Sequence, residues 1–390
     1  MRSSASRQSW IIALPVIALL IWTVIYPNAA VIAGSFEDGL GHWREFLNSP
    51  ADLEALRTSL VISVASVFAS LAIGVPLAFL LGRFEFPGRR LLRAVATLPA
   101  ALPPLVGVIA FLFLYGESGV VTRAIQRALG MAEAPWQLKG VSAIVFVHAY
   151  TMYVYVFLFV SAGLERFDAT LDEAASGLGA STWRRLRRVT LPLLMPAVAG
   201  SMLLVFMNAL GSFSAPYVFG GGLRVLSTQI LASKTNGAMG LAYVETTVLA
   251  LSAIAGLLLF RWLDRKRKYT LASKGGRARR VIRSRRVQLL MTGLSAIIVV
   301  MLVLPHLMVV LVSFARDGSW TTQVLPPEYT LENYRRLFSE SELWRPITNS
   351  VSMALIATAA NLIVCFLAAY LIVFRRFAGR RFLELLVALP

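Results

Sequence analysis

The chain has 390 residues, of which 57% are hydrophobic and 15% are charged, and its mean hydropathy is +0.69. Soluble proteins carry roughly 25% charged residues, and so much apolar side chain cannot be hidden inside a water-soluble particle of this size. The composition therefore excludes an ordinary soluble domain and predicts an all-α integral membrane protein. The net charge of +18 would suggest nucleic acid in a soluble protein, so the membrane topology has to explain it.

Apolar runs of helical length follow one another along the chain. A helix needs about 20 apolar residues to cross a hydrocarbon core about 30 Å thick. A last run begins near 383, and the others occupy 10–33, 57–82, 94–115, 141–163, 193–215, 241–263, 288–314 and 347–374. The first run follows Arg2 and Arg7 but is longer than the apolar core of a signal peptide, so we interpret it as a retained span.

The basic residues are distributed unevenly between the two sides of the membrane. If the N-terminus is cytoplasmic, the inside segments hold 27 of the 38 Lys and Arg residues and 7 of the 20 acidic residues. These segments then carry a net charge of +20, and the rest of the chain carries −2. Because cytoplasmic loops are enriched in Lys and Arg, this orientation is predicted. Topology and contact with anionic lipid explain the basic excess, and no nucleic-acid partner is expected.

Residues that could carry enzyme chemistry are sparse. Cys365 is the single cysteine, so neither a disulfide framework nor a cysteine metal cluster is available. His42, His148 and His306 have no spacing typical of metal ligands. The sequence contains no phosphate-binding loop, no Leu-Ser-Gly-Gly-Gln segment and no catalytic triad or carboxylate pair in its loops. We therefore expect no enzyme active site, no metal site and no cofactor within this chain.

Two parts of the chain resemble each other. Residues 59–99 align without a gap to residues 350–390, with 12 of 41 positions identical. Both copies contain a Phe-x-Gly-Arg-Arg turn, beginning at Phe86 and Phe377, which is followed at the same distance by Leu-Pro. Six spans, an even number, separate the equivalent helices. The sequence thus predicts a tandem repeat of six-span units in which both copies have the same orientation.

This repeat predicts the domain organisation. The second copy reaches only the equivalent of Pro99, so we expect it to be truncated and a complete chain to end near residue ~550. The predicted parts are a first span with its external loop (1–55), the first membrane core (56–263), a basic cytoplasmic linker (264–286), the first span and external loop of the second copy (287–346), and the start of a second core (347–390).

The longest internal loop of the first copy, residues 172–192, has the pattern of two short helices joined by a turn. Acidic residues open the first helix, where the helix dipole favours them, and Gly177 or Gly179 can end it in a left-handed conformation. Ser181 or Thr182 is a suitable N-cap for the second helix. Such an element at the cytoplasmic surface of the membrane has the right form to be bound by a soluble partner.

A motif in this loop carries a family resemblance. It reads Glu-Ala-Ala, three residues, Gly, nine residues, Val, one residue and Leu-Pro, formed by Glu173, Ala174, Ala175, Gly179, Val189, Leu191 and Pro192. The chain thereby resembles the type I permeases of binding-protein-dependent ABC importers, whose hallmark has this spacing. Its two-copy form and the stretch 212–222 resemble, more narrowly, the fused permeases for ferric iron, which have relatives for thiamine, aminoethylphosphonate and polyamines.

The resemblance implies partners and roles. Residues 172–190 would form a coupling helix that docks on a dimeric ABC ATPase, which would bind ATP and Mg²⁺. Glu173 would face basic or polar groups of the ATPase, Ala174 and Ala175 would permit close approach, and Gly179 would make the turn. An extracytoplasmic binding protein would deliver the substrate, and the location would be the bacterial inner membrane. The arginines between 184 and 188 are expected to anchor the loop at the membrane surface.

Polar residues inside spans are the candidates for a translocation path. Asn208, Ser212 and Ser214 recur on the fifth span, where they would either line the path or hydrogen-bond neighbouring helices. Glu245 is expected at the interface, at the outer end of the sixth span. An ion-coupled secondary transporter, the alternative class, predicts carboxylates inside the membrane and usually inverted repeats, and the sequence indicates neither.

The third apolar run contains an unusual number of helix-breaking residues. Pro99, Pro103 and Pro104 occur within it, followed by Gly107. Proline removes a backbone donor and clashes with the preceding turn, so this span is predicted to be kinked or broken. The break would serve either as a hinge or as a packing adjustment.

Overall fold

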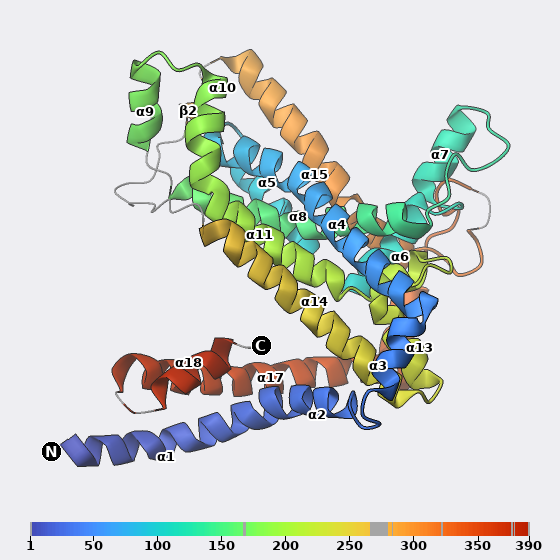
Figure 1. Cartoon of the computed structure of the whole chain (residues 1–390). Coiled ribbons are helices and arrows are strands. Elements are labelled where there is room, and N and C mark those ends of the chain that lie inside the picture. Colours follow the sequence, from blue (N-terminus) through green and yellow to red (C-terminus); the bar gives the residue numbers. More distant parts are fainter. Residues whose placement is uncertain are drawn as a thin grey trace. The chain divides into compact units, whose positions relative to one another are not determined.

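A computed structural model of the chain (Figure 1) describes residues 2–166, 169–265, 280–282, 284–320, 323–375, 377 and 379–388. The described chain is almost entirely helical, as the composition predicted. It divides into two units, residues 1–44 with 330–390, and residues 45–329. Each unit has its own hydrophobic core.

The smaller unit is built from the two ends of the chain. Its helices are α1 (Arg2–Leu20), the π turn η1 (Ile21–Ile25), α2 (Tyr26–Gly34), α16 (Glu332–Ser339), α17 (Ser341–Phe374) and α18 (Arg380–Ala388). Ala13, Val16 and Leu20 recur at helical spacing on α1 and pack with Leu371 of α17 and Leu383 of α18. The Trp10 ring also meets Phe377 edge to face, 5.4 Å between centroids. The first span is therefore held by the last helices of the chain.

The larger unit contains most of the spans. Its boundary with the smaller unit falls inside α3. The elements are α3 (Gly41–Asn48), α4 (Pro50–Arg83), β1 (Phe84–Glu85), α5 (Arg89–Val95), the 3₁₀ turn η2 (Leu98–Ala101), α6 (Pro104–Tyr115), α7 (Val120–Ala128), α8 (Gly140–Glu165), α9 (Ala169–Gly177), α10 (Thr182–Arg185), the π turn η3 (Leu186–Thr190), α11 (Leu191–Leu210), α12 (Ser214–Phe219), α13 (Leu226–Thr235), α14 (Met239–Arg265), β2 (Arg280–Val281) and α15 (Arg285–Ser313).

The centre of the larger unit is the packing of α4, α8 and α11. Gly74 lets α4 approach α8 closely, because a Cβ at this position would lie 2.6 Å from Cβ of Val156 and 2.8 Å from the carbonyl oxygen of Tyr153. α8 is the most enclosed span, with 67% of its most apolar stretch buried. It therefore provides the fixed surface against which the other helices of this unit are arranged.

The helix α15 also belongs to the larger unit. It packs against α4, α5 and α6, and it buries Val299, Leu302 and Val303 in the main core. The phenol of Tyr150 on α8 lies 3.1 Å from Nδ1 of His306 on α15. Before α15 in the chain, β2 forms a two-residue parallel pair with β1, with Phe84 opposite Arg280. The span that follows the basic linker is thus an integral part of this core.

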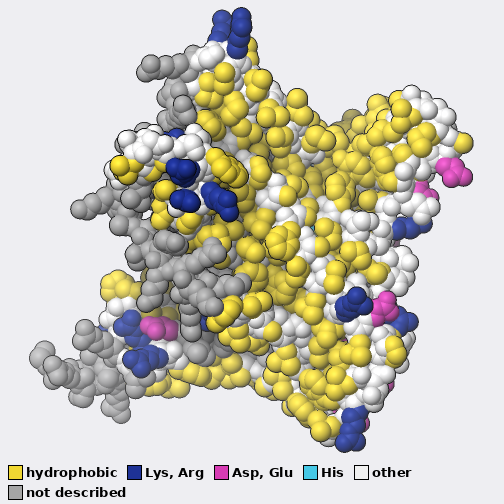
Figure 2. Space-filling model, turned by 45° about the horizontal axis from the view of Figure 1, so that its top comes forward, with side chains coloured by type: hydrophobic (Ala, Val, Ile, Leu, Met, Phe, Trp, Pro, Cys, Tyr) yellow, Lys and Arg dark blue, Asp and Glu magenta, His cyan; other side chains and the backbone are white. Residues whose placement is uncertain are grey.

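Eight helical stretches of the described chain are long and apolar enough to cross a membrane. Six of them coincide with predicted runs, whereas the fifth, Thr182–Leu210, begins earlier than the run 193–215 and ends before Ser212 and Ser214, which the prediction had placed on that span. The third also differs, because the run 94–115 is broken between α5 and α6 by the turn η2, and the membrane-length stretch is Pro104–Ala128. Hydrophobic side chains form most of the surface visible in Figure 2, and charged side chains occur there in a few small groups. This surface is suited to contact with lipid.

The expectation for Glu245 was wrong. Its side chain is fully buried rather than interfacial, and its Oε1 accepts a hydrogen bond of 2.8 Å from the Ser233 hydroxyl. The physical reason is α13, which lies beside α14 and covers the carboxyl group. Hydropathy along a single helix contains no information about such a neighbour.

Candidate functional site

The predicted helix, turn and second helix are present at residues 169–185. Gly179 has a φ of +77°, and the amides of Gly179 and Ala180 donate to the carbonyls of Ser176 and Ala175, both at 3.0 Å. This pair of hydrogen bonds is a Schellman motif, which closes a helix through a left-handed glycine. The Ser181 hydroxyl then accepts from the Arg184 amide at 3.4 Å, so Ser181 is the N-cap of α10. The local chemistry of the sequence thus determines this turn.

The residues of the motif lie on both sides of the turn. Glu173, Ala174 and Ala175 lie in α9, and of these Ala174 is exposed and Ala175 half-buried. Gly179 is exposed in the turn itself. The half-buried Val189, Leu191 and Pro192 follow at the start of the next long helix.

The second helix of this loop was predicted to be short, but it continues into the next membrane span. α10, η3 and α11 form one continuous helical stretch, Thr182–Leu210. Pro192 lies in the first turn of α11, as predicted, and the π turn η3 comes directly before it, with the Leu191 amide donating to the Leu186 carbonyl. The ring of a proline clashes with the carbonyl four residues earlier, and a wider turn relieves this clash. The turn at Gly179 is therefore connected to the membrane interior by a single helix.

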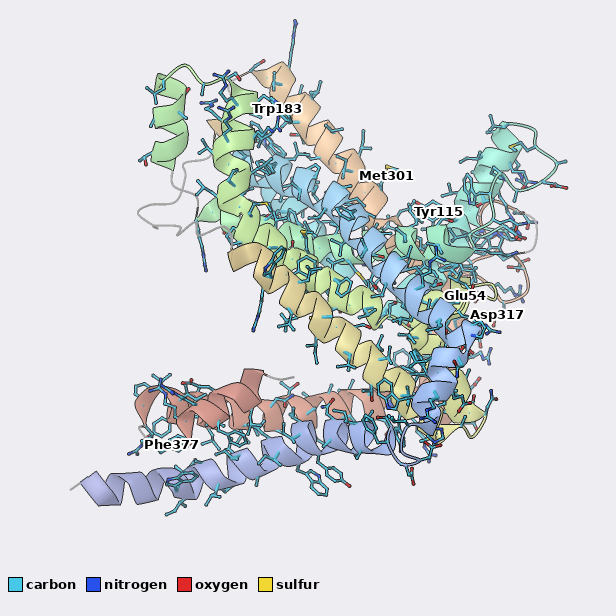
Figure 3. All side chains as sticks on the ribbon, in the orientation of Figure 1. Glu54, Tyr115, Trp183, Met301, Asp317 and Phe377 are labelled. Atoms are coloured by element: carbon cyan, nitrogen blue, oxygen red, sulfur yellow. The ribbon has the colours of Figure 1, made fainter. Side chains whose placement is uncertain are left out.

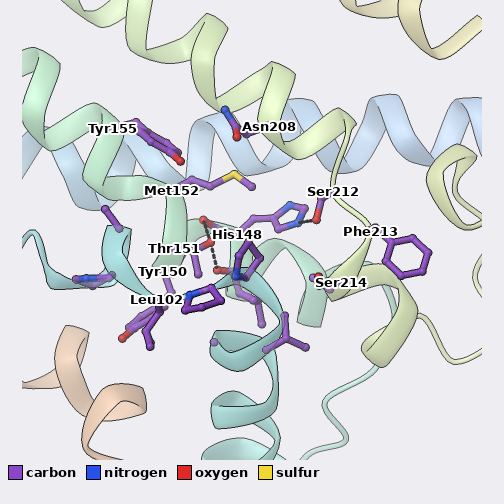
Figure 4. A pocket seen from close by; sticks show the side chains of 18 of the residues that line it. Leu102, His148, Tyr150, Thr151, Met152, Tyr155, Asn208, Ser212, Phe213 and Ser214 are labelled. Atoms are coloured by element: carbon purple, nitrogen blue, oxygen red, sulfur yellow. Dashed lines mark hydrogen bonds between the residues drawn. The ribbon is translucent and has the colours of Figure 1, made fainter. Parts of the chain in front are cut away.

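A cavity of about 410 Å³ lies at the C-terminal end of that helix (Figure 4). Three elements enclose it: the broken third span around η2 and the start of α6, the middle of α8, and the break between α11 and α12. Its polar lining is formed by His148, Tyr150, Thr151, Tyr155, Asn208, Ser212 and Ser214. None of the described residues that line it is charged. The cavity therefore offers hydroxyl, amide, phenol and imidazole groups between apolar surfaces.

The three residues that the sequence predicted for a translocation path all line this cavity. Asn208 lies in the last turn of α11, Ser212 in the break, and Ser214 at the start of α12. The Asn208 amide nitrogen donates to the Leu204 carbonyl at 2.8 Å, which holds the side chain along its own helix. The proline-rich break of the third span, also predicted, lines the same cavity with Pro99, Pro103 and Pro104.

His148 links the elements around the cavity. The residue is 2% exposed, and its Nδ1 lies 2.9 Å from the Ser66 hydroxyl of α4 while its Nε2 lies 2.9 Å from the Ser212 hydroxyl. Figure 4 shows the Ser212 side chain beside the imidazole ring. The Ser212 carbonyl in turn accepts from the Ser227 hydroxyl of α13 at 2.6 Å. The break between α11 and α12 is thus fixed from two sides.

Sequence reasoning missed two features of this site. His148 gave no signal beyond a polar residue in an apolar run, since its partners come from helices distant in sequence. Leu178 and Trp183 were also not singled out, yet their side chains are 88% and 68% exposed on either side of the Gly179 turn. Figure 3 labels Trp183 at the start of α10. Exposed large apolar residues at a turn could have been recognised from the loop pattern itself, because neither belongs to a predicted span.

Several known proteins are similar to this chain. A probable ABC transporter permease of Sinorhizobium fredii is 30% identical over 86% of this chain and 59% of its own length. A ferric transport system permease of Actinobacillus pleuropneumoniae is 26% identical over 96% of this chain and 55% of its own length. A molybdenum transport system permease of Escherichia coli is 32% identical over 54% of this chain and 93% of its own length.

The fold has a counterpart among solved structures. A chain of a bacterial ABC transporter involved in the import of the acidic polysaccharide alginate superposes with a TM-score of 0.58 at 18% identity, covering 67% of this chain and 98% of its own. The present chain spans 55–60% of the length of the relatives that match most of it. The family model for the binding-protein-dependent transport system inner membrane component matches residues 74–269. The chain belongs to this family of membrane permeases.

Proposed function

We propose that this protein is the membrane permease subunit of an ATP-driven importer, and that the turn between α9 and α10 binds the partner ATPase. The chain's family membership supports the permease role. ATP and Mg²⁺ would be bound by the ATPase dimer, and an extracytoplasmic binding protein would deliver the substrate.

One observation carries the proposal: the exposed turn and the cavity lie on the same continuous helix. Thr182–Leu210 comprises 29 residues, which corresponds to about 43 Å at 1.5 Å per residue. Leu178 and Trp183 are exposed near one end, and Asn208 faces the cavity near the other. A displacement of the turn by a partner would move Asn208 directly, because the two are joined by one continuous helix. This is the mechanical connection that an ATP-driven gate requires.

For the cargo we propose ferric iron. Two ferric transport permeases, from Actinobacillus pleuropneumoniae and Haemophilus influenzae, align over 96% of this chain at 26% identity. The molybdenum permeases have higher identity but align over about half of the chain. The molybdenum relatives make an oxyanion the second candidate, and transport assays with ferric iron and molybdate would separate the two.

The role of the turn can be tested with substitutions that leave the fold intact. Leu178→Glu places a charge on a side chain that is already 88% exposed, so folding should be unaffected. We expect this variant to lose at least tenfold in affinity for the ATPase and to lose substrate-stimulated ATP hydrolysis in proteoliposomes, because a desolvated apolar anchor becomes charged. The matched control is Leu129→Glu, a 69% exposed leucine at the end of α7.

Unchanged ATPase binding and stimulation in Leu178→Glu would refute the assignment of the turn. Persistent transport with a catalytically inactive ATPase would refute the importer role itself. The two experiments therefore test separate parts of the proposal.

A further inference from the structure

Two buried carboxyl groups lie together in the larger unit, away from the cavity. Asp52 is the third residue of α4 and is 2% exposed, and Glu245 on α14 is fully buried. The Glu245 carboxyl is in hydrogen-bonding contact with that of Asp52, and its Oε1 accepts from Ser233 of α13. The remaining oxygens Asp52 Oδ1 and Glu245 Oε2 are buried without a hydrogen-bond donor.

Among the described residues, no positive charge compensates this pair. The charged groups that act on Glu245 are the carboxyls of Asp52 and of Glu45 on α3, both of which repel a negative charge. The nearest base along α13 is Lys234, which is exposed, and no ion pair is found between any described Lys or Arg and either carboxyl. Two ionised carboxylates in contact, out of water and without a counter-ion, would be strongly unfavourable.

A contact between two carboxyls is possible when one of them carries a proton. Ionised carboxylates only accept hydrogen bonds, whereas a protonated one also donates. The two carboxyls and the Ser233 hydroxyl together have five side-chain oxygens, fewer than the six or more ligands that Ca²⁺ or Mg²⁺ takes. Among the described residues no group of three His, Cys, Asp or Glu side chains is placed to hold a metal ion. The geometry therefore favours a proton over a metal.

We propose that Asp52 and Glu245 form a proton-binding site that joins α4, α13 and α14. The proton resides on Glu245 and is donated to Asp52, because Asp52 lies in the first turn of α4, where the helix dipole stabilises a negative charge. Glu245 is the seventh residue of α14, beyond its first turn. Loss of this proton would leave two adjacent carboxylates and would separate the ends of the three helices.

The site makes stability depend on pH in a defined direction. Above the ordinary titration range of carboxyls, the folded pair retains a proton that the unfolded chain has released. Stability then falls as pH rises, by up to about tenfold in the folding equilibrium constant per pH unit once the site begins to titrate. Glu245→Gln removes this dependence, since its amide N–H replaces the O–H donor to Asp52 at every pH.

The experiment compares thermal unfolding of the purified full chain in detergent between about pH 6 and pH 9. We expect Glu245→Gln to match the wild type near pH 6 and to remain stable at pH 9, where the wild type is weakened. Glu54→Gln is the control, because Glu54 is an exposed carboxyl on α4, the helix that carries Asp52, and this variant should keep the wild-type slope. Equal pH slopes in wild type and Glu245→Gln would overturn the proposal.

Infrared spectroscopy provides a second measurement that does not depend on how the variant folds. The wild type at neutral pH should show the C=O stretch of a protonated carboxylic acid, and its absence would overturn the proposal. A stability that responds to added Na⁺ or Ca²⁺ at constant pH, but not to pH, would also overturn it, because the ligand would then be a metal cation.

Discussion

At the scale of single residues, Gly177 and Gly179 differ only in backbone conformation. A Cβ added at either glycine would meet no atom within 4 Å, but Gly179 has a φ of +77° whereas Gly177 is helical. Gly179→Ala should therefore weaken the turn by roughly 1–2 kcal/mol, the cost of a left-handed conformation. Gly177→Ala, the matched control, should stabilise α9 by about 0.5–1 kcal/mol.

Hydrogen exchange provides the measurement for this pair. The amides of Gly179 and Ala180, whose hydrogen bonds close the turn, should exchange at least fivefold faster in Gly179→Ala and no faster in Gly177→Ala. If the two alanine variants behave alike, the turn does not depend on the left-handed glycine.

Residue-scale features were predictable where the cause was local. The Gly179 turn, the Ser181 cap and the place of Pro192 all follow from neighbouring residues, and each was found. The pairing of His148 with Ser66 and Ser212 was not predictable, because it depends on which faces of α4, α8 and α11 meet. The coupling role of Glu173 and the path role of Asn208 remain predictions.

At the scale of elements, the contact between α4 and α8 depends on the absence of a side chain at Gly74. Gly74→Ala should destabilise the larger unit by about 1–3 kcal/mol, because a Cβ 2.6 Å from that of Val156 forces the helices apart. The control is Gly293→Ala on α15, where a Cβ meets nothing within 4 Å and helix propensity should improve stability slightly. Chemical unfolding in detergent measures the stability of both variants. Equal stabilities would show that the close approach of α4 and α8 does not depend on the glycine at position 74.

The sequence predicted the long helices well because their length and hydropathy are set by the membrane itself. It also predicted the broken third span from its prolines. The π turns were not predicted, although η1 and η3 share a cause: each is followed directly by an X-Pro pair, Tyr26-Pro27 or Leu191-Pro192. The burial of Glu245 was predicted incorrectly, since it results from α13 folding back on α14.

At the scale of the whole molecule, the two units combine segments that are distant in sequence. α1 packs with α17 and α18 in the smaller unit, whereas α15 packs with α4, α5 and α6 in the larger one. If the chain is divided into the two predicted copies, the first span of the first copy, α1, packs with helices of the second copy. The first span of the second copy, α15, packs with helices of the first. The basic linker proposed at 264–286 lies mostly outside the described residues.

Because α15 packs on helices that come before the linker, and α17 and α18 pack on α1, the two parts of the chain should stay associated when the covalent link between α14 and α15 is cut. A protease site inserted between Arg265 and Arg280 should allow cleavage in detergent, after which the two fragments should still elute together on size exclusion. The contacts of α15 with the core, including Tyr150 to His306 at 3.1 Å, persist without the linker. The same protease site placed in the 130–138 loop serves as the control for accessibility. Separation of the fragments after cleavage at the linker would contradict the packing of α15.

The uncharged lining of the cavity has a consequence for how a cargo would pass. On the proposed path, an ion would meet the dipoles of Asn208, Ser212 and Tyr155 but no opposite charge among the described lining residues, so it would be bound weakly and released readily. A passage of this kind has little power to discriminate between solutes of similar size. Recognition would then belong to whatever presents the solute at the entrance, and one such membrane channel could be adapted to new nutrients without rebuilding its interior.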